Sequence, residues 1–177
     1  MSDIKFEIVE EFGQLGNGTY SPELNKVKWN DSEPKWDIRK WSEDGKTPFK
    51  GVALDDSEAS QLVSLIETAL ETKKNSKPIQ EVSLGRATAK ILNVFGKLSE
   101  SGKMTKQLLY VNWGKKPKYD LRSWSEDYQK CGKGLTLDEA ECKKLYDLLT
   151  AELSQCINKK SATPKGISVD LDDDLFI

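Results

Sequence analysis

The chain has 177 residues and a formal net charge of −2, with 37% hydrophobic and 32% charged residues, which is typical of a globular protein rather than a disordered one. No apolar run reaches the roughly 20 residues that a membrane-spanning helix needs, and residues 1–10 lack the apolar core of a signal peptide, so we expect a cytoplasmic protein. Histidine is absent, the three cysteines lack C-x-x-C spacing and no phosphate-binding glycine motif occurs, so we expect free thiols, no metal, no cofactor and no enzymatic activity.

The first predicted unit covers residues 1–72 and consists of four strands followed by one helix. Apolar residues between positions 6 and 15 indicate an irregular first strand, and the alternation in Val27-Lys28-Trp29 indicates a second. Turn residues lead into a third strand at 35–41, and a shorter fourth strand follows at 51–54. Acidic residues at 55–58, followed by apolar residues at helical spacing, predict a helix that runs to about Leu70.

The same pattern returns about 83 residues later. Residues 34–44 read P-K-W-D-I-R-K-W-S-E-D and residues 117–127 read P-K-Y-D-L-R-S-W-S-E-D, so eight of eleven positions are identical. The pattern indicates a tandem duplication, with a polar linker at 73–81 and a second unit at 82–155. Because a unit of about 70 residues has a small core, we expect the two units to pack helix to helix as a pseudo-dimer within one chain.

The third strand of each unit separates an apolar face from a charged face, because side chains alternate across a strand. Trp36, like Tyr119 in the second unit, belongs to the core face, whereas Arg39 and Trp41 lie on the charged face. Basic side chains neutralise phosphates, and an exposed indole stacks on an unpaired base. In the alternative interpretation the tryptophans are core residues, and Asp37 and Asp120 pair with the neighbouring arginines. The predicted nucleic-acid-binding residues are Trp29, Lys35, Arg39, Trp41, Lys46, Lys50, Trp113, Lys118, Arg122, Trp124, Lys130 and Lys133.

The segment P-K-[WY]-D-[IL]-R-x-W-S-x-D, the K-G-[VL]-x-L-[DE] strand after it and the terminal helix resemble the positive cofactor four family of transcriptional coactivators, in particular its bacterial YdbC-type branch. The resemblance implies an α+β fold in which each unit is a curved four-stranded antiparallel sheet followed by one helix. It also implies pairing through the helices and binding of single-stranded DNA across the sheets, with Arg39, Trp41, Arg122 and Trp124 at motif positions. Members of that family generally carry one unit, whereas this chain links two, and residues 47–49 differ from residues 130–132, so the halves need not bind equally.

Residues 156–177 are predicted to form a flexible linker and a disordered acidic tail. The end of the chain is similar to the C-terminal tip of bacterial single-stranded DNA-binding proteins, which docks into pockets on replication and repair enzymes, although that tip usually ends Pro-Phe. A solvated terminus without a partner is the alternative. The tail is also a candidate to cover the basic face, in which case deletion of residues 168–177 tightens DNA binding at low salt. The predicted partner-binding residues are Asp172, Asp173, Asp174, Leu175, Phe176 and Ile177.

These features together predict a sequence-tolerant single-stranded DNA-binding protein for DNA replication, recombination or repair. We expect it to act in the cytoplasm of a bacterial cell, with a phage origin and further self-association left open. A transcription cofactor that binds single-stranded or melted DNA is the alternative. A module whose sheet binds a peptide or partner protein is a third interpretation, and an enzyme is the least favoured.

Overall fold

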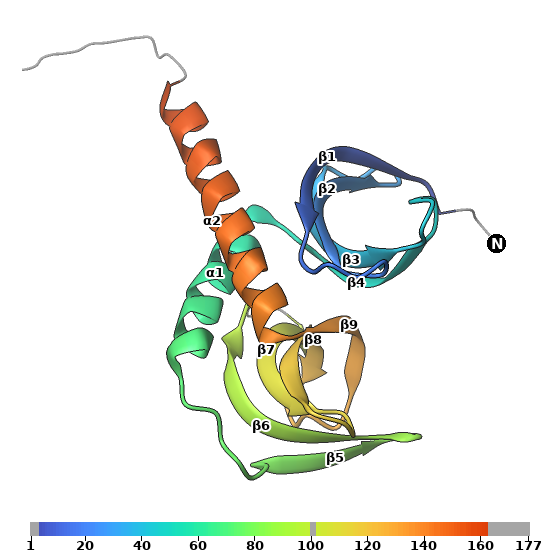
Figure 1. Ribbon diagram of the computed structural model, residues 1–177, viewed down its shortest axis with the longest axis vertical. Coiled ribbons are helices and arrows are strands. Elements are labelled where there is room, and N and C mark those ends of the chain that lie inside the picture. The colour runs from blue at the N-terminus through green and yellow to red at the C-terminus, as the bar shows by residue number, and fades with distance from the viewer. Residues whose placement is uncertain (1–3, 100–101, 163–177) are drawn as a thin grey trace, which may run out of the picture.

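The computed structural model describes residues 4–99 and 102–162, and these form two antiparallel sheets, each followed by a helix (Figure 1). The predicted α+β fold of two tandem sheet–helix units is confirmed. The strands pair in the orders β1-β2-β3-β4 and β5-β6-β7-β8-β9. The elements of the first unit are β1 (Phe6–Gln14), β2 (Glu23–Trp29), β3 (Lys35–Trp41), β4 (Pro48–Leu54) and α1 (Asp56–Glu71). Those of the second are β5 (Gln80–Leu84), β6 (Ala87–Lys97), β7 (Met104–Asn112), β8 (Pro117–Ser125), β9 (Cys131–Leu137) and α2 (Glu139–Ala162).

The second unit differs from the prediction at both of its ends. It has five strands rather than four, because β5 begins at Gln80, within the predicted linker, and turns back through Gly85 to pair with β6. Gly85 has a φ of 68°, which glycine adopts without strain. At the other end α2 continues to Ala162, so residues 156–162 are helical rather than part of the predicted flexible tail. The predicted partner-binding residues 172–177 lie outside the described residues.

Both helices begin with the same capping arrangement, which explains why the acidic residues recur there. The Asp55 carboxylate accepts a hydrogen bond from the Glu58 backbone N–H at 2.7 Å, and the Glu58 side chain accepts one from the Asp55 N–H at 3.0 Å. Asp138 and Glu141 form the same reciprocal pair at 2.8 and 2.9 Å. These capping boxes satisfy N–H groups that the first turn of a helix leaves free, and so fix where each helix starts.

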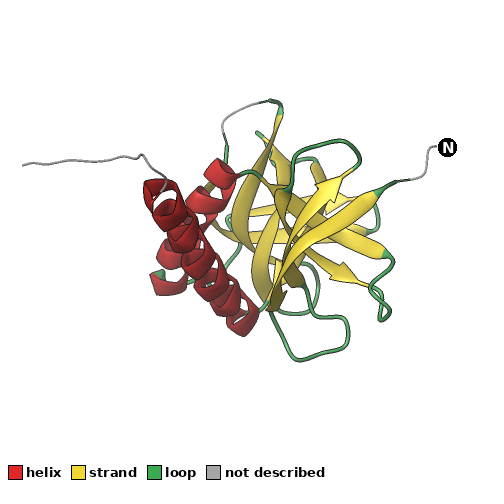
Figure 2. Cartoon of the chain, turned by 90° about the horizontal axis from the view of Figure 1, so that it is seen from above, coloured by secondary structure: helices red, strands yellow, loops and turns green. Residues whose placement is uncertain are grey.

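The two units share one core, with the helices in one layer and the sheets in the other (Figure 2). Each helix packs over the first long strand of the other unit: α1 places Leu65 against Gly96 of β6, and α2 places Leu148 against Gly13 of β1. Both glycines have positive φ angles, 153° and 140°, and both lie at irregular points of their strands. The predicted pseudo-dimer is therefore confirmed. The buried residues of this core include Leu24, Trp36, Ile38, Leu62 and Ile66 of the first unit and Leu108, Tyr119, Leu121, Leu145 and Leu149 of the second.

A polar contact also joins the units. The Lys106 ammonium on β7 donates to the Ala53 carbonyl at 2.8 Å and lies 3.1 Å from a carboxylate oxygen of Glu58, which belongs to the capping box of α1. Neither α1 nor α2 is long and apolar enough to cross a membrane.

Candidate nucleic-acid interface

The face of each sheet that turns away from the helices has an apolar interior of its own. The sheets curl strongly around this face (Figure 1). In the second unit Trp124 is fully buried there among residues that include Ile91 and Val111, and in the first unit Trp41 is only 3% exposed. The prediction that these two indoles are exposed is therefore wrong. Strand alternation placed them on the correct face, but the curvature of the sheet encloses that face instead of presenting it to solvent.

A buried aspartate organises each of these interiors. Asp120 has no exposed surface and accepts hydrogen bonds from the indole N–H groups of Trp113 and Trp124, both at 3.1 Å, and from Nε of Arg122 at 2.8 Å. Burial raises the pKa of the Asp120 carboxyl, while the charge of Arg122 and these hydrogen bonds act in the opposite direction. The interpretation that Asp120 pairs with its neighbouring arginine is confirmed.

The first unit repeats this network with one partner fewer. Asp37, also fully buried, accepts from the Trp29 indole at 3.0 Å and from Nη2 of Arg39 at 2.9 Å. Arg39 lies over the Trp29 ring with 4.5 Å between guanidinium carbon and ring centre, and Arg122 lies over Trp113 at 4.8 Å. The repeated tryptophan, aspartate and arginine therefore form a scaffold, and the guanidinium groups cover its indoles.

A glycine opposite each arginine permits this arrangement. Gly51 pairs in register with Arg39, and Gly134 pairs with Arg122. A Cβ at Gly134 would collide with Cβ of Arg122 and with the Leu121 carbonyl, and a Cβ at Gly51 would meet the corresponding atoms of its own neighbours. The recurring K-G-[VL] sequence is thus explained by close approach of the last two strands in each sheet.

Basic side chains gather around a hollow where the two sheets meet. β4 of the first unit lies beside β9 of the second, and a hollow of about 300 Å³ opens there. Lys40, Phe49 and Lys50 line it from the first unit, and Arg122 and Thr136 line it from the second. Phe49 is 44% exposed. The hollow thus combines three cations with an aromatic ring that solvent can reach.

A second hollow of about 250 Å³ lies next to the first, and Thr136 lines both. Val111 and the half-buried Trp113 form its apolar side, and three lysines of the turn between β7 and β8 and of β8 itself surround it. We call the two hollows together the basic track, and define it by Lys40, Phe49, Lys50, Trp113, Lys115, Lys116, Lys118, Arg122 and Thr136.

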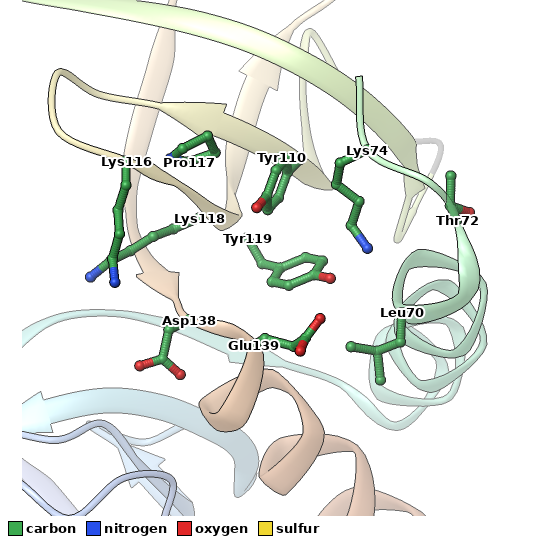
Figure 3. A pocket seen from close by; sticks show the side chains of 10 residues that line it. All are labelled: Leu70, Thr72, Lys74, Tyr110, Lys116, Pro117, Lys118, Tyr119, Asp138 and Glu139. Carbon is green, nitrogen blue, oxygen red and sulfur yellow. The ribbon is translucent and has the colours of Figure 1, made fainter. Parts of the chain in front are cut away.

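A third hollow, of about 460 Å³, lies beyond the end of the basic track, toward the helices, and shares Lys116 and Lys118 with it (Figure 3). The Lys74 ammonium reaches into it, donates to the Ala69 carbonyl and lies 5.0 Å from the centre of the Tyr119 ring. Burial lowers the pKa of the Lys74 ammonium. Asp138 and Glu139 line the same hollow, so acidic and basic side chains are mixed there. We therefore do not count this hollow as part of the basic track.

The basic track contains part of the predicted site. It brings together Lys50, Trp113, Lys118 and Arg122. The other exposed basic residues of the prediction, Lys35, Lys46, Lys130 and Lys133, line none of the three hollows. The sequence-based prediction did not include Lys40, Phe49, Lys115 and Lys116. Lys115 and Lys116 could have been found from the sequence, because they follow Trp113 in a turn whose counterpart in the first unit is acidic.

The fold and the basic track define this chain as a tandem sheet–helix protein with a cationic groove across its two units. No family model matches the chain. A protein of Treponema pallidum (strain Nichols), named "Uncharacterized protein", is 46% identical over 59 residues, which cover 32% of this chain and 69% of that protein. The chain belongs to the same family as this bacterial protein. Those shares also mean that the relative is less than half as long as this chain, a length closer to one unit than to two.

Proposed function

We propose that this chain is a sequence-tolerant single-stranded DNA-binding protein for DNA replication, recombination or repair, without catalytic activity. The observation that carries the proposal is the basic track. Five lysines and one arginine border two neighbouring hollows that share Thr136, and no Asp or Glu lines either of them among the described residues. Such a groove attracts a phosphate backbone, and its affinity depends on the release of counterions.

The exposed aromatic ring of the basic track favours an unpaired strand over a duplex. Phe49 offers this ring beside Lys40 and Lys50, whereas Trp113, which Arg122 covers, forms part of an apolar wall beside three lysines. An unpaired base stacks on an exposed ring for about 1–3 kcal/mol, whereas a duplex keeps the faces of its bases stacked inside.

A transcription cofactor for single-stranded or melted DNA is the alternative, and it would use the same track. The two differ in their partners rather than in their DNA chemistry. We propose that residues 172–177, which lie outside the described residues, recruit replication or repair proteins through their aspartates and apolar end. A bacterial setting agrees with the Treponema relative.

The proposal is tested by titrating labelled oligonucleotides of one sequence, single-stranded and duplex, into the full chain. We expect tighter binding of the single strand and a logarithmic salt dependence of about −0.7 per phosphate contacted. The double variant Lys115→Ala/Lys116→Ala should reduce that slope by about 1.4, on the same scale. The matched control is Lys143→Ala/Lys144→Ala, which removes an adjacent pair of exposed lysines from α2, outside all three hollows.

Phe49→Ala separates stacking from charge. We expect it to weaken binding by about 1–3 kcal/mol with an unchanged salt slope, because it removes a base platform and no cation. Equal affinity for single strand and duplex, or equal effects of the two dilysine variants, would contradict the proposed function.

A further inference from the structure

We infer that the two halves of the duplication do not bind DNA equally: one strand follows the basic track, over β4 and the second sheet, and the first sheet binds no strand of its own. The inference rests on the proposed function and says which parts of the two units form its site. Three comparisons between residues at equivalent repeat positions support it. They concern the charge of a turn, the packing beside a tryptophan and the hollow between the two sheets.

The first comparison concerns the turn between the second and third strands of the repeat. After Trp113 this turn carries Lys115 and Lys116, whereas after Trp29 it carries Asp31 and Glu33. All four of these side chains are exposed. Two positive charges attract phosphates at the second turn, and two negative charges repel them at the first.

The second comparison concerns the space beside the tryptophan of each turn. In the first unit Phe6 packs against Trp29 with 5.5 Å between ring centres, and the backbone of Lys5 makes hydrogen bonds of 2.7 and 3.1 Å with Asn30. The chain entering β1 therefore lies along the first turn. The repeat counterpart of Phe6 is Ala89, and beside Trp113 the hollow of about 250 Å³ is open.

The third comparison concerns the hollow between the two sheets. Lys40 and Phe49 line it from the first unit. Their counterparts in the second unit are Ser123 and Gly132, so exchanging the two units would replace a cation with a hydroxyl and remove the aromatic ring. The groove at this junction is therefore one-sided, which means that the equivalent position on the other side of the pseudo-twofold axis lacks this cation and this ring.

One-sidedness has a consequence for the direction of binding. Two identical halves related by a twofold axis present the same groove to a strand running either way. The basic track has a Phe49 end and a Lys115 end that differ in chemistry, so the sugar–phosphate chain, which has a direction, meets different contacts in its two orientations. The chain should thus bind one strand in one preferred direction.

Matched single variants at repeat counterparts test this inference. Lys118 lines the basic track, whereas its repeat counterpart Lys35 does not. In the same way Lys50 lines the track, whereas its counterpart Lys133 does not. We expect Lys118→Ala and Lys50→Ala each to remove about one phosphate contact. The ratio of affinities at about 50 and about 200 mM salt should then fall by about 2.6-fold for each variant.

Lys35→Ala and Lys133→Ala should leave both the affinity and the salt slope unchanged. Titration at protein concentrations well above Kd should give one short oligonucleotide per chain. Equal losses within each matched pair, or two oligonucleotides per chain, would overturn the inference while leaving the proposed function intact. Absence of single-strand binding by the unaltered chain would instead overturn the proposed function.

Discussion

Replacement of Gly134 by alanine tests the close approach of β8 and β9 that sets Arg122 in the basic track. A Cβ at this position would collide with Cβ of Arg122 and with the Leu121 carbonyl, and would lie 2.9 Å from Cα of Arg122. These atoms belong to the backbone or to the first side-chain carbon, so no change of rotamer relieves the collision and the strands must separate. Overpacking costs about 1–3 kcal/mol and sometimes more, and we place this backbone case at about 3 kcal/mol.

The loss is measured by thermal or urea unfolding of the full chain. A loss of about 3 kcal/mol lowers Tm by about 6–12 °C, at about 2–4 °C per kcal/mol for a domain of this size. The control is Gly132→Ala on the same strand, where a Cβ would lie 3.7 Å from Cβ of Ser123, an ordinary contact. We expect this control to stay within about 0.5 kcal/mol of the unaltered chain. Equal stability of the two variants would refute the role assigned to the repeated glycine.

Three further changes test other parts of the structure. Asp120→Asn should destabilise the chain by about 3–5 kcal/mol in urea unfolding, because it removes the charge that compensates a largely buried arginine. Lys106→Met should cost about 1–3 kcal/mol because it removes one donor each from the Glu58 carboxylate and the Ala53 carbonyl. Lys90→Met, which breaks an exposed pair, should cost less than about 1 kcal/mol. Burial raises the pKa of the Cys142 thiol to about 12, so it is protonated at neutral pH. In a chain with Cys142 as its sole cysteine, a thiol reagent should label it only upon unfolding.

The duplication could be predicted from the sequence because it rests on identity at matched positions, and it implied the shared core. The strand β5 could not be predicted in the same way. It has five residues, and only Val82 and Leu84 show its alternation, within a stretch whose polar residues and Pro78 are typical of a linker. The extension of α2 was missed for a related reason: the polar composition after residue 157 indicated a linker, yet no glycine or proline interrupts the helix before Pro164.

The burial of Trp41 and Trp124 could not be predicted from the sequence. Alternation along a strand assigns a residue to one face of the sheet, but it does not tell whether solvent reaches that face. A curled sheet encloses one face and packs helices on the other, so both of its faces are interiors. The hollow between β4 and β9 needs the relative position of two edges about 80 residues apart in sequence, which no local pattern contains. The lysines of the turn at 115–116 were accessible to sequence reasoning through comparison with residues 31–33.

Comparison of the two halves shows which residues of the repeated motif are kept and which differ between the copies. The aspartate, arginine and second tryptophan of the motif are the same in both units, and all of them are buried or half-buried. Hydrogen bonds join the aspartate to the arginine in both units and to the second tryptophan in the second unit. Lys40, inside the same motif, corresponds to Ser123 in the second copy. Lys40 lines the hollow between the sheets. Identity between the copies does not by itself separate scaffold from proposed site, because Lys50 and Lys118 of the basic track are the same residue types as their counterparts Lys133 and Lys35. Under the proposed function, the differences at Lys40 and Phe49 are what make the junction between the sheets unlike its symmetry counterpart.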